Sequence, residues 1–75
     1  MGYAVVQATI NGDLVSFAVV SEHGSNKNAA ITKFHQLAAA LWNDSAEVHA
    51  TIKIVNEKFD TVDGKVEFVD HPAKA

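Results

Sequence analysis

The chain has 75 residues with 48% hydrophobic and 20% charged content, which limits it to a single domain over residues 1–75. Cys is absent, and this excludes disulfides, thiolate metal ligands and a thiol nucleophile. The formal net charge is -3, and all six basic residues are Lys. Arg, which is the side chain best suited to bind phosphates and guanine edges, does not occur. The charge pattern therefore argues against a nucleic-acid-binding protein.

The first predicted unit is a β-hairpin. Residues 3–10 and 13–20 are rich in Val and alternate in polarity, and Asn11-Gly12 between them is typical of a two-residue type I′ turn. Pairing of Ile10 with Asp13 places seven side chains on one face, which we expect to be the core face: Ala4, Val6, Ala8, Ile10, Val15, Phe17 and Val19. The opposite face is half apolar.

An amphipathic helix is predicted over residues 29–42. Residues 22–28 form a polar loop in which Ser25, Asn26 or Asn28 could cap the helix. At about 100° per residue, six apolar side chains fall on one stripe that we expect to face the sheet: Ala30, Ile31, Phe34, Leu37, Ala38 and Leu41. The polar residues 43–45 end the helix.

Strand alternation returns after the helix. From residue 46 on, the even-numbered apolar side chains are expected to point inward: Val48, Ala50, Ile52 and Ile54. A second hairpin turn is predicted at Asp63-Gly64, with four further side chains on a common inward face: Phe59, Thr61, Val66 and Phe68. Because the inward parity changes between Ile54 and Phe59, residues 46–62 form either one bent strand or two. Residues 1–2 and 70–75 are expected to be frayed.

These elements predict an α+β fold, in which an antiparallel sheet of four or five strands in ββαββ order carries one helix packed across one face. One helix covers only one side of such a sheet, so an apolar second side must be covered by something else. On the predicted outward face of the first hairpin, four residues form a contiguous apolar end: Tyr3, Val5, Ala18 and Val20.

We predict that this apolar end is an interface between copies of the chain. A domain of this size buries only about 60% of the surface that its unfolded chain exposes, so association would add stability. The expected product is a homodimer or a higher oligomer, and another protein is a further partner. The alternative is that the C-terminal hairpin or tail covers these residues within one chain.

No catalytic constellation is present in the sequence. The Ser residues lack a G-x-S-x-G elbow, the glycines are dispersed, and the acidic residues near the C-terminus do not follow a calcium-loop pattern. The four His residues lack the spacing of metal ligands. We therefore predict a non-enzymatic interaction module without a cofactor or metal. A small-ligand or metal-binding domain using His35, Trp42 and His49 is the second hypothesis, and a nucleic-acid-binding accessory protein is the third.

Trp42, the single Trp, lies on a flank of the predicted helix together with His35 and Ala39. In one interpretation Trp42 seals the edge of the core between helix and sheet. In the other, His35, Ala39 and Trp42 form a docking rim for a partner, because aromatic side chains are enriched at interface hot spots.

Several short motifs carry a resemblance to a known group of proteins. They are KFHQL at 33–37, LWN at 41–43, IVNE at 54–57, VDG at 62–64 and EFVDHP at 67–72. Together they resemble small uncharacterised proteins encoded in bacteriophage and prophage genomes of Gram-positive bacteria. The resemblance implies an accessory or virion-associated product and brings no catalytic residue with it. Since no segment approaches the roughly 18 apolar residues of a membrane span, we expect the chain in the cytoplasm of a bacterium or an infected host, with no membrane partner.

Overall fold

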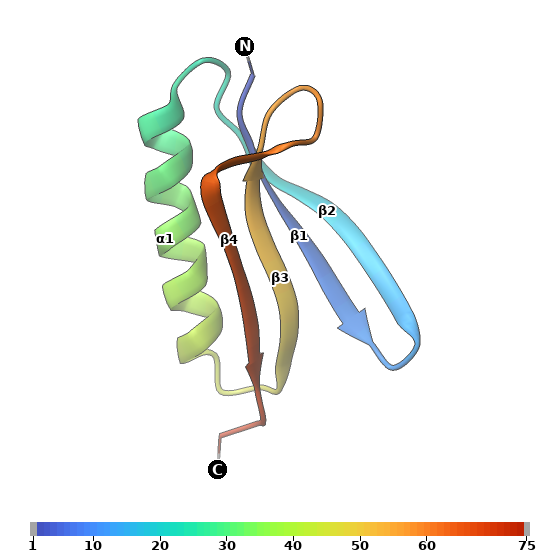
Figure 1. Cartoon of the computed structure of the whole chain (residues 1–75). Helices are drawn as coiled ribbons and strands as arrows, with labels where there is room; N and C mark the ends of the chain where they lie inside the picture. Colours follow the sequence, from blue (N-terminus) through green and yellow to red (C-terminus); the bar gives the residue numbers. More distant parts are fainter. Residues whose placement is uncertain (1, 75) are drawn as a thin grey trace.

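A computed structural model describes residues 2–74. Strands β1 (Ala4–Asn11) and β2 (Leu14–Glu22) are followed by helix α1 (Lys27–Asn43) and strands β3 (Val48–Val55) and β4 (Thr61–His71). The strands form one antiparallel sheet in the order β2-β1-β3-β4 (Figure 1). The predicted α+β class and the ββαββ order are confirmed, and the described residues form four strands rather than five.

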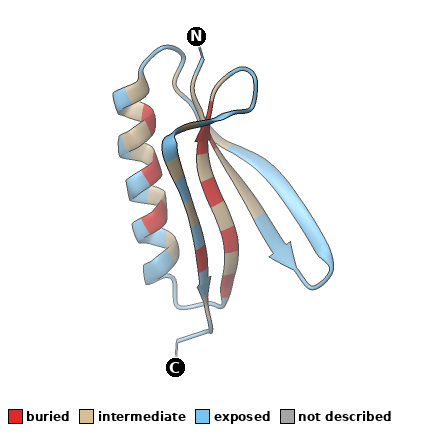
Figure 2. Ribbon diagram, viewed as in Figure 1, coloured by how far each residue is buried: buried red, intermediate tan, exposed pale blue. Residues whose placement is uncertain are grey.

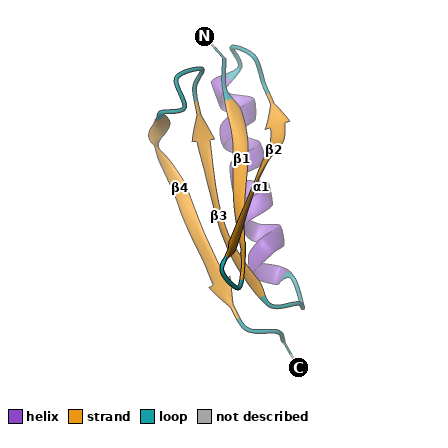
Figure 3. Cartoon of the chain, turned by 90° about the vertical axis from the view of Figure 1, so that its right-hand side faces the viewer, coloured by secondary structure: helices purple, strands orange, loops and turns teal. Residues whose placement is uncertain are grey.

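Helix α1 lies on one side of the sheet (Figure 3). Of the three candidate caps, Asn26 is the one used: its side-chain oxygen accepts a hydrogen bond of 3.0 Å from the backbone N–H of Ala29. The predicted apolar stripe is confirmed. Its buried members are Ala30, Phe34 and Ala38, and its partly buried members, which pack against the core, are Ile31, Leu37 and Leu41.

The core lies between α1 and the sheet. Strand β3 is paired on both sides, by β1 and by β4, and its even-numbered side chains are buried against the helix as predicted (Figure 2). Ile52 and Ile54 are fully buried, as are Val5 of β1 and Val69 of β4. The centre of the domain is therefore β3, with Phe34 as the one large side chain that α1 buries.

The turn of the first hairpin differs from the predicted one. Asn11 pairs with Leu14, so the two turn residues are Gly12 and Asp13. Gly12 at the first central position has a φ of +65°, whereas Asp13 at the second does not have a positive φ, so the turn is of type II′ rather than type I′. Ile10 consequently pairs with Val15 instead of Asp13. This difference is two residues, so the side chains still lie on the faces that were predicted.

The prediction of which hairpin face is the core face is wrong. Val5 is fully buried in the cluster beneath α1, and Tyr3 and Val20 pack against that cluster. Most of the side chains assigned to the core lie on the opposite side and are exposed, Phe17 by 76%. Of the predicted interface residues Tyr3, Val5, Ala18 and Val20, only Ala18 is exposed.

The position of α1 explains this reversal. The helix covers β3, β4 and the start of β1, while the rest of the β1–β2 hairpin extends beyond it (Figure 1). On the helix side, Tyr3 just before β1 and Val5 within it are apolar, and the polar residues Gln7 and Thr9 follow. That face is therefore apolar where the helix covers it and polar where it is exposed to solvent.

The second predicted hairpin is also wrong, and residues 46–62 hold neither one bent strand nor two complete strands, since β3 ends at Val55 and only Thr61 and Val62 of this range belong to β4. A loop over residues 56–60 joins β3 to β4. Asp63 and Gly64 have positive φ values, but they lie inside β4, where the pairing with β3 shifts register. Asp63 there forms an ion pair of 2.8 Å with Lys27 at the start of α1, and this raises the pKa of Lys27. The dipeptide thus forms a bulge instead of a turn.

The C-terminal tail is more ordered than predicted. Strand β4 continues to His71, with Asp70 paired to His49, and the backbone N–H of Lys74 donates a 2.8 Å hydrogen bond to the carbonyl oxygen of Ser45. At the other end, the Gly2 backbone N–H donates to Glu57 at 3.0 Å. Of the residues expected to be frayed, Met1 and Ala75 lie outside the described residues.

Candidate functional site

The side of the sheet opposite α1 is apolar and uncovered, and we call it the open face. It is built by side chains from all four strands and by one side chain of the loop before β4. Those with the largest apolar groups are Ile10, Val15, Phe17, Val19, Phe59, Val66 and Phe68, and their exposed fractions run from 38% for Ile10 to 76% for Phe17.

The exposed area of the open face is large for a chain of this size. At roughly 180 Å² for a side chain of this size, these exposed fractions correspond to about 700 Å². The largest apolar patch of a typical monomer is about 300–600 Å². The open face therefore exceeds an ordinary surface patch.

Side-chain size gives the open face its shape. In one row across the sheet, Ala8 of β1 and Thr51 of β3 are paired in the middle, with Phe17 of β2 at one end and Phe68 of β4 at the other. Because two small side chains lie between two large ones, the surface is depressed in the middle of this row. A groove of about 430 Å³ lies over these central strands, with Val15 and Phe17 on one side and Val66 and Phe59 on the other.

The loop at residues 56–60 holds Phe59 over this groove. Phe59 has a φ of +66°, which is unusual for a bulky residue and costs about 1–3 kcal/mol. The side-chain oxygen of Asn56 accepts hydrogen bonds from the backbone N–H groups of Lys58 and Asp60, at 2.9 and 3.1 Å. Lys53 Nζ lies 4.7 Å from the centroid of the Phe59 ring. This end of the open face thus carries an exposed aromatic ring, held by the loop, and the cation of Lys53 from β3 beside it.

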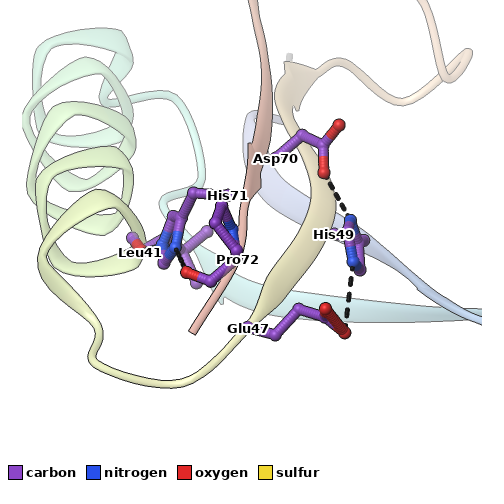
Figure 4. A network of polar contacts seen from close by, with 6 residues as sticks. All are labelled: Leu41, Glu47, His49, Asp70, His71 and Pro72. Atoms are coloured by element: carbon purple, nitrogen blue, oxygen red, sulfur yellow. Dashed lines mark hydrogen bonds and ion pairs between the residues drawn. The ribbon is translucent and has the colours of Figure 1, made fainter. Parts of the chain in front are cut away.

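The other end of the open face is acidic. His49 contacts Asp70 through Nδ1 and lies 3.4 Å from a Glu47 carboxylate oxygen through Nε2 (Figure 4). Among residues 2–74, no group of three or more His, Asp and Glu side chains is arranged to hold a metal ion. The structure also separates the three residues of the metal hypothesis, since His35 and Trp42 lie on α1 and His49 lies on the open face.

Trp42 connects the end of α1 to β4. Its indole Nε1 donates a 2.6 Å hydrogen bond to Glu67, and its ring stacks on His71 with the centroids 5.8 Å apart. Lys74 Nζ donates to the carbonyl oxygen of Trp42 at 2.7 Å. Trp42 is 41% exposed at the junction of α1 and β4, and the interpretation that it seals the edge of the core stays a prediction. His35 and Ala39 are exposed on α1, and the docking rim stays a prediction.

His71 belongs to the same junction and carries a pH-dependent contribution to stability. Nδ1 lies 2.8 Å from the carbonyl oxygen of Pro72, and Nε2 lies 2.8 Å from that of Leu41 (Figure 4). Only the protonated ring can donate from both nitrogens, so these carbonyls, that of Pro72 first, raise the pKa of His71. Asp44 adds to this rise, while partial desolvation and Lys74 oppose it.

A raised pKa in the folded state means that protonated His71 stabilises the fold. This contribution is complete below the unfolded pKa of about 6.5 and is lost as the pH rises through the higher pKa of the folded state. We expect the melting temperature of the wild type to exceed that of His71→Phe, which keeps a ring against Trp42, by a margin that shrinks as the pH is raised. Thermal unfolding followed by circular dichroism from acidic to alkaline pH measures this margin, and a margin independent of pH would contradict the assignment.

Comparison with known proteins gives no assignment. The chain matches no protein-family model, no curated protein and no solved structure. Within residues 2–74, no helix combines the length and the apolar character needed to cross a membrane.

Proposed function

We propose that this protein is a non-enzymatic interaction module that associates with itself by stacking two open faces. The supporting observation is the size of the uncovered apolar area, about 700 Å². Each partner in a standard protein–protein interface contributes about 800 Å². A second copy stacked on the open face supplies this area and gives a small domain the second layer that it lacks.

The charges on the open face favour a second copy as the occupant. Lys53 lies toward one end of β3, and Glu47 and Asp70 lie at the other end. In a two-fold stack with reversed strand directions, Lys53 of each copy approaches the acidic end of the other. The apolar side chains of the two open faces then meet in the middle of the interface, and the charged side chains lie at its rim.

The resemblance to phage and prophage proteins supplies the context of this proposal. A self-associating module of this kind would serve as an accessory or virion-associated protein in the cytoplasm of a bacterial host. The docking rim of His35, Ala39 and Trp42 lies on α1, on the other side of the sheet, and stays available to another protein in such a stack.

The test compares two exposed hydrophobic residues. Phe68 is 53% exposed on the open face, whereas Leu14 is 71% exposed but points to the other side of the sheet. We expect Phe68→Lys to weaken self-association about 30-fold or more, the equivalent of a hot spot of ~2 kcal/mol, and Leu14→Lys to leave it nearly unchanged. Sedimentation equilibrium at micromolar concentrations measures both, with circular dichroism to verify folding.

The possible outcomes separate the alternatives. Equal effects of the two substitutions would mean that association depends on general hydrophobicity and not on the open face. A wild type that stays monomeric over the whole concentration range would refute self-association and favour the small-ligand alternative, for which the groove of about 430 Å³ is large enough.

A further inference from the structure

The outer edge of β2 is a second surface suited to association. β2 is the terminal strand of the sheet, and within residues 2–74 no strand pairs with its outer side. Residues 14–19 are all exposed, and the segment from 14 to 21 contains neither a charged residue nor a Pro. Charges, prolines and bulges are the usual protection of a sheet edge against pairing with another chain.

The register shows which backbone groups are free on this edge. Asn11 and Leu14 flank the two-residue turn and form a hydrogen-bonded pair, and such pairs alternate with non-hydrogen-bonded ones. Val15, Phe17 and Val19 therefore direct their N–H and C=O groups away from β1. They form a regular row of donors and acceptors that ends at the register shift after Val19.

The other edge of the sheet is protected. β4 carries Asp63, Glu67 and Asp70, and its pairing is interrupted by the positive φ values of Asp63 and Gly64. Asp63 is also held by its ion pair with Lys27. The two edges thus differ in the way expected if one is kept from pairing and the other is used for it.

We infer that β2 pairs antiparallel with β2 of a second copy about a two-fold axis at Phe17, joining two sheets into one. The partner is a second copy because the strand is complementary to itself in this register. On the open face Phe17 meets Phe17 and Val15 meets Val19, and on the other face Ser16 meets Ala18. Within the regular row, residues 15–19 of one copy pair with residues 15–19 of the other, and none of these residues is charged, so no like charges oppose each other.

This contact does not rest on the open-face contact, and the two are compatible. Edge pairing uses the backbone of β2 and leaves both open faces on the same side of the joined sheet. Two joined sheets stacked through their open faces form a tetramer with two kinds of two-fold contact. We therefore expect the wild type to reach a tetramer.

A pair of double variants tests the register. Ser16 and Ala18 are exposed and point away from the open face. Across the two-fold axis, residue 16 of one copy lies opposite residue 18 of the other. These are non-hydrogen-bonded pairs, in which the two side chains lie closer together than in hydrogen-bonded pairs. S16K/A18K places like charges opposite each other twice, whereas S16K/A18E places opposite charges there. We expect S16K/A18K to sediment with half the mass of the wild type and S16K/A18E to keep the full mass.

The outcomes distinguish this inference from the open-face proposal. S16K/A18K at the wild-type mass, or the same loss of mass in both double variants, overturns the edge contact. Phe68→Lys at the wild-type mass overturns the open-face contact instead. If both contacts form, each of S16K/A18K and Phe68→Lys halves the mass, and the triple variant that combines them is a folded monomer.

Discussion

Val5→Glu is expected to abolish the folded state, whereas Val6→Glu, at the next position of the same strand, is expected to leave it intact. Val5 is fully buried in the cluster beneath α1, and within residues 2–74 none of the buried residues is polar or charged. A carboxylate there would lose the apolar contacts of Val and would be buried without a partner, at a cost of several kcal/mol. A domain of 75 residues has a stability of roughly 4–11 kcal/mol.

Val6 lies on the open face and pairs with Lys53, so a carboxylate at this position faces solvent and a cation. Far-UV circular dichroism and urea unfolding measure the contrast: Val5→Glu should lack a cooperative transition, and Val6→Glu should keep one while it associates more weakly than the wild type. An unfolded Val6→Glu beside a folded Val5→Glu would mean that the helix covers the other face of the hairpin. Two folded variants would mean that it covers neither side chain.

The elements whose environment is uniform along their length were predictable from sequence. α1 packs with one stripe over its whole length, and every even-numbered side chain of β3 from Val48 to Ile54 lies under it, so the periodicity of each segment reports its burial directly. The α+β class follows from these segments and from the hairpin.

The covered face of the first hairpin was not predictable in the same way. Which face the helix takes depends on the loop before α1 and on the insertion of β3 beside β1, and neither is encoded in the hairpin strands. A signal was present nonetheless. One face of β1 changes from the apolar Tyr3 and Val5 to the polar Gln7 and Thr9, whereas the other face stays apolar along its whole length. A change of character halfway along a strand indicates partial cover by a short element.

The residues of the candidate site were not predictable from the sequence for the same reason. The expectation of an uncovered apolar sheet side is met by the structure, but its residues are those that had been assigned to the core, such as Phe17. The glycine dipeptides misled for a local reason. A left-handed conformation is needed by bulges as well as by turns, so Asp63-Gly64 satisfied the preference for a turn while forming an irregularity within β4.

Phe34→Ala is expected to destabilise the fold by about 3–5 kcal/mol, the usual cost of deleting a buried aromatic ring. Phe34 is 4% exposed, and the other two buried residues of α1 are Ala30 and Ala38, so its ring is the main anchor of the helix on Ile52 and its neighbours. Without it, α1 packs on the sheet mainly through Ile31, Leu37 and Leu41, which are only partly buried.

Phe68→Ala is the matched control, because it deletes the same ring from the open face. At concentrations below the dissociation constant of the assembly, its free energy of unfolding should lie within about 1 kcal/mol of the wild type, since a half-exposed ring has little burial to lose. At high concentration the difference in the free energy of unfolding between the wild type and Phe68→Ala should grow, because association stabilises the folded wild type more than the variant. Urea unfolding at two protein concentrations measures both effects. If Phe68→Ala instead cost as much as Phe34→Ala in the dilute monomer, the open face would already be packed within one chain, and neither stacking nor a second copy would be needed to explain it.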